Sequence, residues 1–149
     1  MKIAIVSSSG PRLMELLQVR EAWKNESVFF AVDKGYESLI LLQTERVHFL
    51  RKGGPLPLAS FLLNLWLSLR AFNKENPDIV VCNDAFLGYW FCLFARSRKK
   101  SVVFIAPFVR NKSPSFWEKQ AYRMADLFLV QWQDLLDVLQ SAEYSGSVL

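Results

Sequence analysis

The chain opens with residues whose types and spacing suit the binding of an anion. An apolar strand pattern ends at Ser7, the polar turn Ser8, Ser9 and Gly10 follows at once, and a helical pattern of leucines begins at Leu13. A strand that turns directly into a helix presents backbone N–H groups and the positive end of the helix dipole to a ligand. Glycine permits a tight turn, and serine hydroxyls cap the helix or contact the ligand. This turn is therefore expected to face a ligand.

Two further segments carry groups that can do chemistry. Asp84 directly follows a predicted strand and is the carboxylate best placed for acid or base work, while capping of the next helix is the alternative. Arg110 and Lys112 lie in the loop 106–113, where an arginine suits phosphate and ordinary surface charge is the alternative. The lone His48 lies between apolar neighbours in a strand pattern, which indicates a structural role.

Several classes of chemistry lack support in the sequence. No set of Cys, His, Asp and Glu has the spacing of a metal site, so no metal is expected. The serines of the first turn lack a GxSxG pattern and an evident base, and a single glycine there departs from the GxGxxG of dinucleotide-binding turns. The net charge of +4 accompanies no RNA- or DNA-binding signature, which argues against nucleic acid.

The composition is rich in apolar side chains. Apolar residues make up 52% of the chain and aromatic residues 14%, which indicates an aromatic core or an apolar surface reserved for a partner or a bilayer. Cys82 and Cys92 lie in apolar patterns and fit a reduced cytosolic protein better than a disulfide framework. The first apolar stretch is too short for a signal peptide, so secretion is not expected.

Short β-branched runs alternate with helical patterns, which is typical of an α/β fold with a parallel sheet covered by helices. Strands are predicted at residues 2–7, 28–32, 47–50, 79–83, 102–106 and 127–130. Helices are predicted at 12–24, 58–76, 86–96, 116–124 and 133–140, with a short helix and turn at 35–44. The length and the lack of a linker predict one Rossmann-like domain, residues 1–149, whose ligands bind at the carboxyl ends of the strands.

The segment 56–72 is more apolar than a helix packed on a sheet requires. Ser60, Asn64 and Ser68 recur every four residues as one narrow polar stripe, while leucines and aromatic residues occupy the rest. An outer helix needs an apolar face of about 100°, and a bilayer span needs about 20 apolar residues. Three alternatives remain: burial in the core, contact with a membrane interface, or contact with a partner protein. Basic residues near both ends favour a position at the level of lipid headgroups.

The order of segments is similar to that of a known family. The successive motifs are SSSG with LMELL, ERVHFL, LLNLWLSLRAF, NPDIVVCNDA, SVVFIAPFVRNKS, ADLFLVQW and YSGSVL. They resemble the PssD-like subunits of bacterial polysaccharide glycosyltransferases, which are relatives of the membrane-anchoring subunit of the eukaryotic dolichol-pathway UDP-GlcNAc transferase. The resemblance runs from Met1 to Leu149, and ADLFLVQW and the terminal motif are its most specific parts.

The resemblance implies the N-terminal, acceptor-side half of a split GT-B glycosyltransferase. A PssE-like partner subunit would bind the UDP-sugar, so no cofactor is expected on this chain, and this chain alone would be inactive. The acceptor would be a saccharide on polyprenyl diphosphate, extended in exopolysaccharide or capsule biosynthesis. The chain would lie at the cytoplasmic face of the inner membrane as a peripheral protein.

The resemblance also assigns roles to residues. Asp84 is the candidate base that assists deprotonation of the acceptor hydroxyl in an inverting transfer. Arg12 stands where the family carries a histidine, and its permanently charged guanidinium suits phosphate rather than proton transfer. The acceptor phosphate or sugar is expected to contact Ser8, Ser9, Gly10, Arg12, Arg110, Asn111 and Ser113. Membrane contact is expected for Phe61, Leu62, Leu65, Trp66 and Leu69.

Two other functions remain open at the level of the sequence. One is a non-catalytic scaffold that recruits a partner glycosyltransferase subunit to the membrane, because the chain departs from the family's motifs at Pro11 and Arg12, at Ala106, and in the turn 83–86, where the family carries a small glycine-rich turn. The other is an unrelated nucleotide-binding Rossmann domain. Sugar transfer by a reconstituted pair of subunits, and nucleotide binding by the isolated chain, distinguish these functions from the split transferase.

Overall fold

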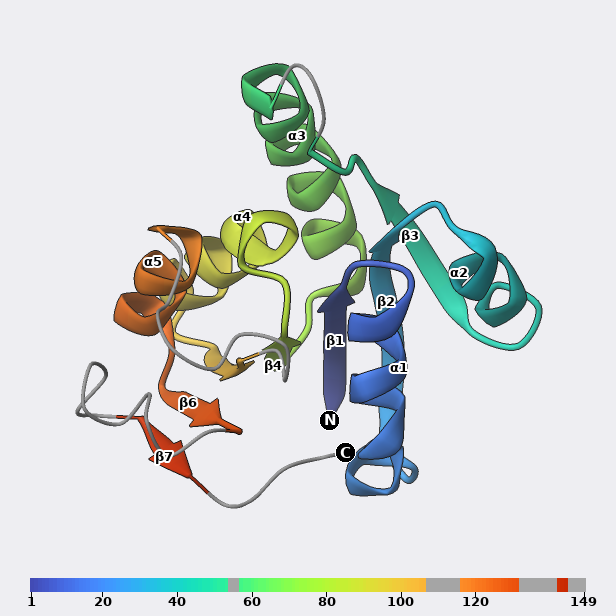
Figure 1. Ribbon diagram of the computed structural model, residues 1–149, viewed down its shortest axis with the longest axis horizontal. Helices are drawn as coiled ribbons and strands as arrows, with labels where there is room; N and C mark the ends of the chain where they lie inside the picture. The colour runs from blue at the N-terminus through green and yellow to red at the C-terminus, as the bar shows by residue number, and fades with distance from the viewer. Residues whose placement is uncertain (54–56, 107–115, 132–141, 145–149) are drawn as a thin grey trace.

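β-Branched and aromatic residues build the central sheet of the molecule (Figure 1). The computed structural model describes residues 1–53, 57–106, 116–131 and 142–144. Within these ranges, seven strands form one parallel sheet with the order β3-β2-β1-β4-β5-β6-β7. The strands are β1 (Lys2–Ser7), β2 (Ser27–Asp33), β3 (Arg46–Leu50), β4 (Ile79–Cys82), β5 (Ser101–Ile105), β6 (Leu127–Val130) and β7 (Glu143–Tyr144).

Helices cover both faces of this sheet. One face carries α1 (Pro11–Gln18), the 3₁₀ helix η1 (Arg20–Trp23) and α2 (Tyr36–Leu41), and the other carries α3 (Pro57–Glu75), α4 (Ala85–Ser97) and α5 (Phe116–Met124) (Figure 1). Successive residues of a strand point to opposite faces. In β1, Ile3 and Ile5 pack with the α1 side of the core, and Ala4 and Val6 pack with the side of α3, α4 and α5. Burial on both faces explains why the strands read as nearly continuous apolar runs.

This architecture confirms the predicted fold class, a Rossmann-like parallel sheet flanked by helices. The strand order from β3 to β6 is that of a doubly wound sheet. β1, β6 and α5 have the predicted bounds, and the other predicted strands and the helices 58–76 and 86–96 differ by one residue at one or both ends. The short helix expected within 35–44 is α2. The predicted helix 133–140 lies outside the described residues.

The predicted helix 12–24 is wrong in its second half. α1 ends at Gln18, and Val19 leaves the helical conformation with φ −101° and ψ 18°. The chain then tightens into η1, and this turn brings Trp23 into the core, where it is 8% exposed. The burial of one large side chain therefore overrides the continuous helical pattern. β7 was also not predicted, because its two exposed residues carry no apolar run.

α4 approaches β4 closely at Gly88. A Cβ atom at this position would collide with Cys82 Sγ and would contact a side-chain carbon of Val6 at 3.5 Å. Cys82 is fully buried, and its thiol donates a hydrogen bond to the backbone oxygen of Asp84 at 3.1 Å. Burial, together with the neighbouring thiol of Cys92, raises the pKa of Cys82 well above its ordinary value. The distance between helix and strand therefore depends on the absence of a side chain at Gly88.

A first prediction follows from this contact. Gly88→Ala is expected to lower the free energy of unfolding by about 1–3 kcal/mol, because the added methyl group overpacks the core beside Cys82. Combining it with Cys82→Ala removes the colliding sulfur, so the double variant is expected to lose less than the sum of the two single variants. Urea unfolding of the four proteins measures this coupling, and strictly additive losses would contradict the close approach.

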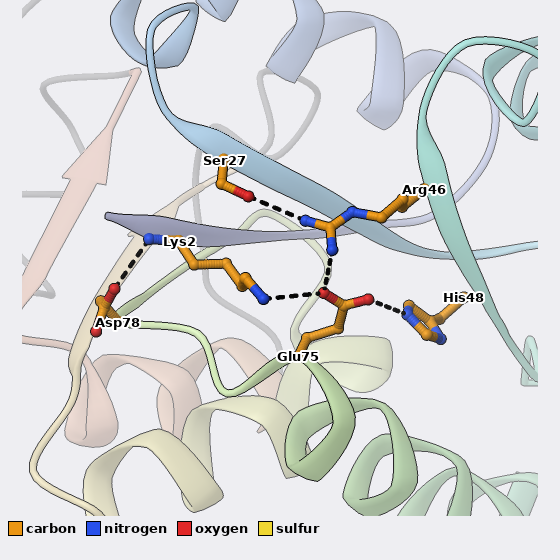
Figure 2. A network of polar contacts seen from close by, with 6 residues as sticks. All are labelled: Lys2, Ser27, Arg46, His48, Glu75 and Asp78. Atoms are coloured by element: carbon orange, nitrogen blue, oxygen red, sulfur yellow. Dashed lines mark hydrogen bonds and ion pairs between the residues drawn. The ribbon is translucent and has the colours of Figure 1, made fainter.

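A buried carboxylate ties the C-terminal end of α3 to the strands (Figure 2). One oxygen of Glu75 accepts from Arg46 Nη1 at 2.7 Å and lies 3.5 Å from Lys2 Nζ, and the other bonds His48 Nε2 at 3.1 Å. Burial raises the pKa of Glu75, but the hydrogen bond from His48 and the charges of Arg46 and Lys2 outweigh it, so the pKa is lowered from 4.5. Together with its edge-on packing against Phe29, this contact gives His48 the predicted structural role.

Glu75→Gln is expected to lower the free energy of unfolding by about 2 kcal/mol at pH 7, because the charge-assisted hydrogen bonds are lost. The folded-state pKa of Glu75 is lowered, so the contribution of its carboxylate is present above the unfolded-state pKa and is lost as the pH falls through the folded value. The difference between the wild-type protein and Glu75→Gln should therefore shrink below pH 4.5. Denaturant unfolding between pH 3 and pH 7 tests this, and a difference independent of pH would contradict the assignment.

Candidate functional site

The loops that follow β1 and β4 meet at the carboxyl edge of the sheet. From β1 to β3 the sheet grows on one side of β1, and from β4 onward it grows on the other side. At this point α1 leaves β1 toward one face of the sheet and α4 leaves β4 toward the other (Figure 1). Arg12 Nη1 donates to Asp84 Oδ2 at 2.9 Å, and Asn83 Nδ2 donates to the backbone oxygen of Arg12 at 2.6 Å. The fold thus brings Arg12 and Asp84 together, two predicted site residues that lie 72 positions apart in the sequence.

Asp84 caps α4 as well as pairing with Arg12. The backbone N–H of Leu87 donates to Asp84 Oδ1 at 3.1 Å, which is the geometry of a helix N-cap. Asp84 is 7% exposed and lines a cavity at this edge of the sheet. Both of its oxygens are engaged, so the capping role that the sequence left as an alternative is confirmed.

The first turn is held against α2. The backbone N–H of Ser9 donates to Asp33 Oδ1 at 2.6 Å, and its hydroxyl donates to Glu37 Oε2 at 3.1 Å. The same hydroxyl accepts from the backbone N–H of Ser38 at 3.3 Å, and a Cβ atom on Gly35 would collide with it. The Ser9 side chain therefore fixes the turn to the neighbouring loop. Gly10 precedes α1 with φ 101°, a left-handed conformation that favours glycine, and no side chain caps the helix there.

A cavity of about 310 Å³ opens beside the Arg12–Asp84 ion pair. Lys52 and Glu118 add charged groups to its wall, and Phe86 and Trp117 add aromatic rings. Ser8, Ser9 and Gly10 do not line it, and Ser8 is buried beneath the turn. Arg110, Asn111 and Ser113 lie outside the described residues. Among the described residues that were expected to contact the acceptor, Arg12 is therefore the one that lines this cavity.

Sequence reasoning missed Lys52, Phe86, Trp117 and Glu118, all of which line the cavity. A signal for Lys52 was present, since it follows the predicted strand 47–50 and ligands gather at the carboxyl ends of parallel strands. Trp117 and Glu118 carry no comparable signal, because they belong to the first turn of α5. Their position follows from how α5 packs beside α4, which no local pattern reports.

An apolar hollow of about 560 Å³ adjoins the cavity and shares Gly53, Phe86 and Trp117 with it. Its remaining wall comes from Pro57, Leu58 and Phe61 at the start of α3. The ring of Phe61 lies 5.0 Å from that of Trp117 and 6.0 Å from that of Phe86, between ring centroids. Phe61, one of the residues expected to contact a membrane, is half-buried, and its ring packs in an aromatic cluster between α3, α4 and α5.

α3 has its polar stripe inside and its leucines outside. Asn64 and Ser68 are fully buried, and the Asn64 side chain accepts from the backbone N–H of Arg51 at 2.7 Å and donates to its backbone oxygen at 2.8 Å. Trp66 is 57% exposed and Leu62 54%. The exposed apolar residues form one face of the helix, called the outer face of α3, which comprises Leu58, Leu62, Leu63, Trp66 and Leu69. The alternative that this face is buried in the core is therefore wrong. Leu65, also expected at a membrane, is only half-buried.

Cations flank the outer face of α3. The guanidinium of Arg70 lies 5.5 Å from the centre of the Trp66 ring, a cation–π contact at the surface. Arg51 and Lys52 precede the helix, and Lys74 lies in its last turn, all of them exposed. An aromatic and leucine face with basic residues at both ends has the composition of a surface that contacts anionic lipid. Among the described helices, none combines the length and the apolarity needed to cross a bilayer.

The sequence matches proteins of oligosaccharide biosynthesis. Residues 31–148 match the family described as "Oligosaccharide biosynthesis protein Alg14 like". The human UDP-N-acetylglucosamine transferase subunit ALG14 is 21% identical over 159 aligned positions, covering 98% of this chain and 74% of the human protein. The Schizosaccharomyces pombe subunit of the same name is 35% identical over 77 positions, covering 48% of this chain and 37% of the yeast protein.

Solved structures share the fold at low sequence identity. MurG of Acinetobacter baumannii superimposes with a TM-score of 0.71 at 15% identity, over 100% of this chain and 45% of MurG. UDP-GlcNAc 2-epimerase from Neisseria meningitidis, bound to UDP-GlcNAc, gives a TM-score of 0.70 at 11% identity, over 99% of this chain and 47% of the epimerase. The chain thus spans about half the length of each of these two proteins. By the match over residues 31–148, the chain belongs to the Alg14-like family of oligosaccharide biosynthesis proteins.

Proposed function

We propose that this chain is the acceptor-binding, membrane-associated subunit of a two-chain glycosyltransferase of the bacterial PssD type. Its partner is a PssE-like subunit that binds the UDP-sugar, and its acceptor is a saccharide on polyprenyl diphosphate, extended in exopolysaccharide or capsule biosynthesis. The protein lies peripherally at the cytoplasmic face of the inner membrane. Residues 1–149 form a single domain of this enzyme, and the chain alone is inactive.

The observation that carries the proposal is that a cavity lined by charges lies directly beside an exposed apolar helix. The cavity occupies the carboxyl edge of the sheet, where such folds bind ligands, and the adjoining apolar hollow is lined by Leu58, the first residue of the outer face of α3. An acceptor with a charged sugar diphosphate and an apolar tail requires both surfaces together. The family match supports this role, because the human and Schizosaccharomyces pombe proteins that the chain resembles are each named a subunit of a UDP-N-acetylglucosamine transferase.

The proposed chemistry is a single displacement. The acceptor hydroxyl attacks the anomeric carbon of the sugar, the bond to the nucleotide phosphate breaks, and the nucleoside diphosphate leaves with inversion at that carbon. A carboxylate accepts the hydroxyl proton, and Asp84 is the candidate because it lines the cavity. Arg12 holds Asp84 at 2.9 Å and offers its remaining N–H groups to acceptor phosphate. Arg110, Asn111 and Ser113 are proposed to complete the acceptor contacts.

A second function is favoured by one observation. Both oxygens of Asp84 already have partners, one in the N-cap of α4 and one in the ion pair with Arg12. A carboxylate held in this way serves structure well without any proton transfer. The same surfaces then serve a non-catalytic scaffold that recruits a catalytic partner to the membrane.

Asp84→Asn separates these functions. In a complex reconstituted with the PssE-like partner, loss of the base is expected to lower the rate of sugar transfer by about 100-fold or more. Asparagine caps a helix about as well as aspartate, so the fold should survive, and thermal unfolding checks this. Glu21→Gln, an exposed carboxylate on η1, serves as the control that keeps the wild-type rate. A rate near wild type in Asp84→Asn would exclude Asp84 as the base and favour the scaffold.

The membrane role predicts a different set of phenotypes. Leu62→Asp and Trp66→Asp are expected to weaken binding to vesicles containing phosphatidylglycerol by about tenfold or more, because each places a carboxylate on the outer face of α3. Vesicle co-sedimentation measures the binding.

Met14→Asp is the matched control for these two variants. Met14 is a comparably exposed apolar residue, 47% exposed, but it lies on α1 and should leave vesicle binding unchanged. Equal binding by the wild-type protein and by both α3 variants would contradict membrane contact through this face.

A further inference from the structure

The sequence motif ADLFLVQW contains a glutamine that the proposed chemistry does not use. Gln131 directly follows β6, and its side chain is buried. Its amide nitrogen donates to the backbone oxygen of Ala106 at 2.9 Å and to Glu15 Oε2 at 3.2 Å. Ala106 directly follows β5, and Glu15 lies in α1. One side chain therefore joins the carboxyl ends of two strands to a helix that lies 116 positions away in the sequence.

The partner of this glutamine in α1 is a buried carboxylate close to Arg12. Glu15 follows Arg12 by three residues, so the two side chains occupy neighbouring positions on the helix surface. Glu15 is 6% exposed, and a buried carboxylate is costly unless it is hydrogen-bonded. The amide of Gln131 supplies one such bond. The bond thus attaches α1 to the sheet within one turn of the cation that lines the cavity.

The end of β5 is fixed by the same side chain. The backbone N–H of Ala106 donates to the backbone oxygen of Leu129 in β6 at 2.8 Å, and the backbone oxygen of Ala106 accepts from Gln131. Both backbone groups of this buried residue therefore have partners from β6 or from the residue that follows it. The acceptor that Gln131 binds at the sheet is thus held in place, and α1 is attached to a rigid edge.

The first turns of α1 are attached to the sheet at two separate points. The loop after β4 bonds Arg12 through Asp84 and Asn83, and the residue after β6 bonds Glu15. A helix attached at a single turn can pivot about that turn. A second attachment one turn further along removes this freedom, and with it the freedom of Arg12 to move relative to the carboxyl edge.

We propose that Gln131 is a positioning residue for the acceptor: it fixes the first turns of α1 against the carboxyl ends of β5 and β6, and thereby fixes Arg12. The inference rests on the proposed function, in which Arg12 offers N–H groups to acceptor phosphate. Gln131 itself touches no acceptor in this account. A cation held in place before binding loses less conformational freedom when the phosphate arrives, so the acceptor binds more tightly.

Hydrogen exchange of the isolated chain tests the attachment without partner, membrane or acceptor. Gln131→Leu removes both hydrogen bonds and keeps a buried side chain of similar size. It is expected to speed amide exchange in α1 by about tenfold, while exchange in the last turn of α3 stays as in the wild-type protein. Exchange in α1 that is unchanged by Gln131→Leu would overturn the proposal.

Glu75→Gln is the matched control, because it also removes buried hydrogen bonds but lies at the C-terminal end of α3. It is expected to give the opposite pattern, with faster exchange in the last turn of α3 and unchanged exchange in α1. Faster exchange in α1 of both variants to the same degree would show a general loss of stability and would also overturn the proposal.

Kinetics of the complex reconstituted with the PssE-like partner test the effect on the acceptor. Gln131→Leu is expected to raise the KM for the acceptor about tenfold and to leave kcat and the KM for the UDP-sugar within about twofold. A residue that only stabilises the fold would lower the amount of active complex and change neither KM. Glu75→Gln should accordingly keep both KM values. An unchanged acceptor KM in Gln131→Leu would contradict the positioning role.

The two proposals fail in different ways. A wild-type complex that transfers no sugar removes the glycosyltransferase, and the exchange pattern then decides by itself whether Gln131 holds α1 in place. Sugar transfer by the wild-type complex with the same acceptor KM in Gln131→Leu sustains the glycosyltransferase and removes the positioning role.

Discussion

The divergence of α1 and α4 at the carboxyl edge of the sheet is the constraint on which the site depends. Because these helices leave neighbouring strands toward opposite faces, their loops cannot pack on each other along their whole length. The ion pair between Arg12 and Asp84 and the hydrogen bond from Asn83 hold the two loops at a fixed separation. The cavity lies beside these two loops, and the proposed acceptor contacts are built on its walls.

A second constraint comes from the inside of α3. The side-chain amide of Asn64 bonds both the backbone N–H and the backbone oxygen of Arg51. The oxygen and the nitrogen of this buried amide therefore both have hydrogen-bond partners. Small and polar residues on the buried side let α3 lie close to the chain that follows β3. The large leucines are thereby left for the outside, where they form the outer face. An apolar surface next to the cavity is thus a consequence of how the helix is anchored.

The sequence predicted most of the fold because local patterns and burial agree along the sheet. Buried strands read as apolar runs, and their bounds differ from the prediction by at most one residue at each end. The break at Val19 was not predictable, since the residues before and after it continue the same helical pattern and Trp23 is drawn into the core by contacts distant in sequence. At the site, Arg12 and Asp84 were predicted separately, but their ion pair was not, because 72 positions separate them.

By itself the sequence determined the Rossmann-like class, the residues at the edge of the sheet where folds of this class bind ligands, and an unusually apolar helix. These properties follow from hydrophobic period, turn chemistry and the rule that parallel strands share their carboxyl edge. Only the tertiary structure decided which side of α3 is buried, since a stripe of Ser60, Asn64 and Ser68 reads equally well as solvated or as hydrogen-bonded inside. It also decided that Lys52, Phe86 and Trp117 line one cavity, because side chains from three separate segments meet only when the helices pack.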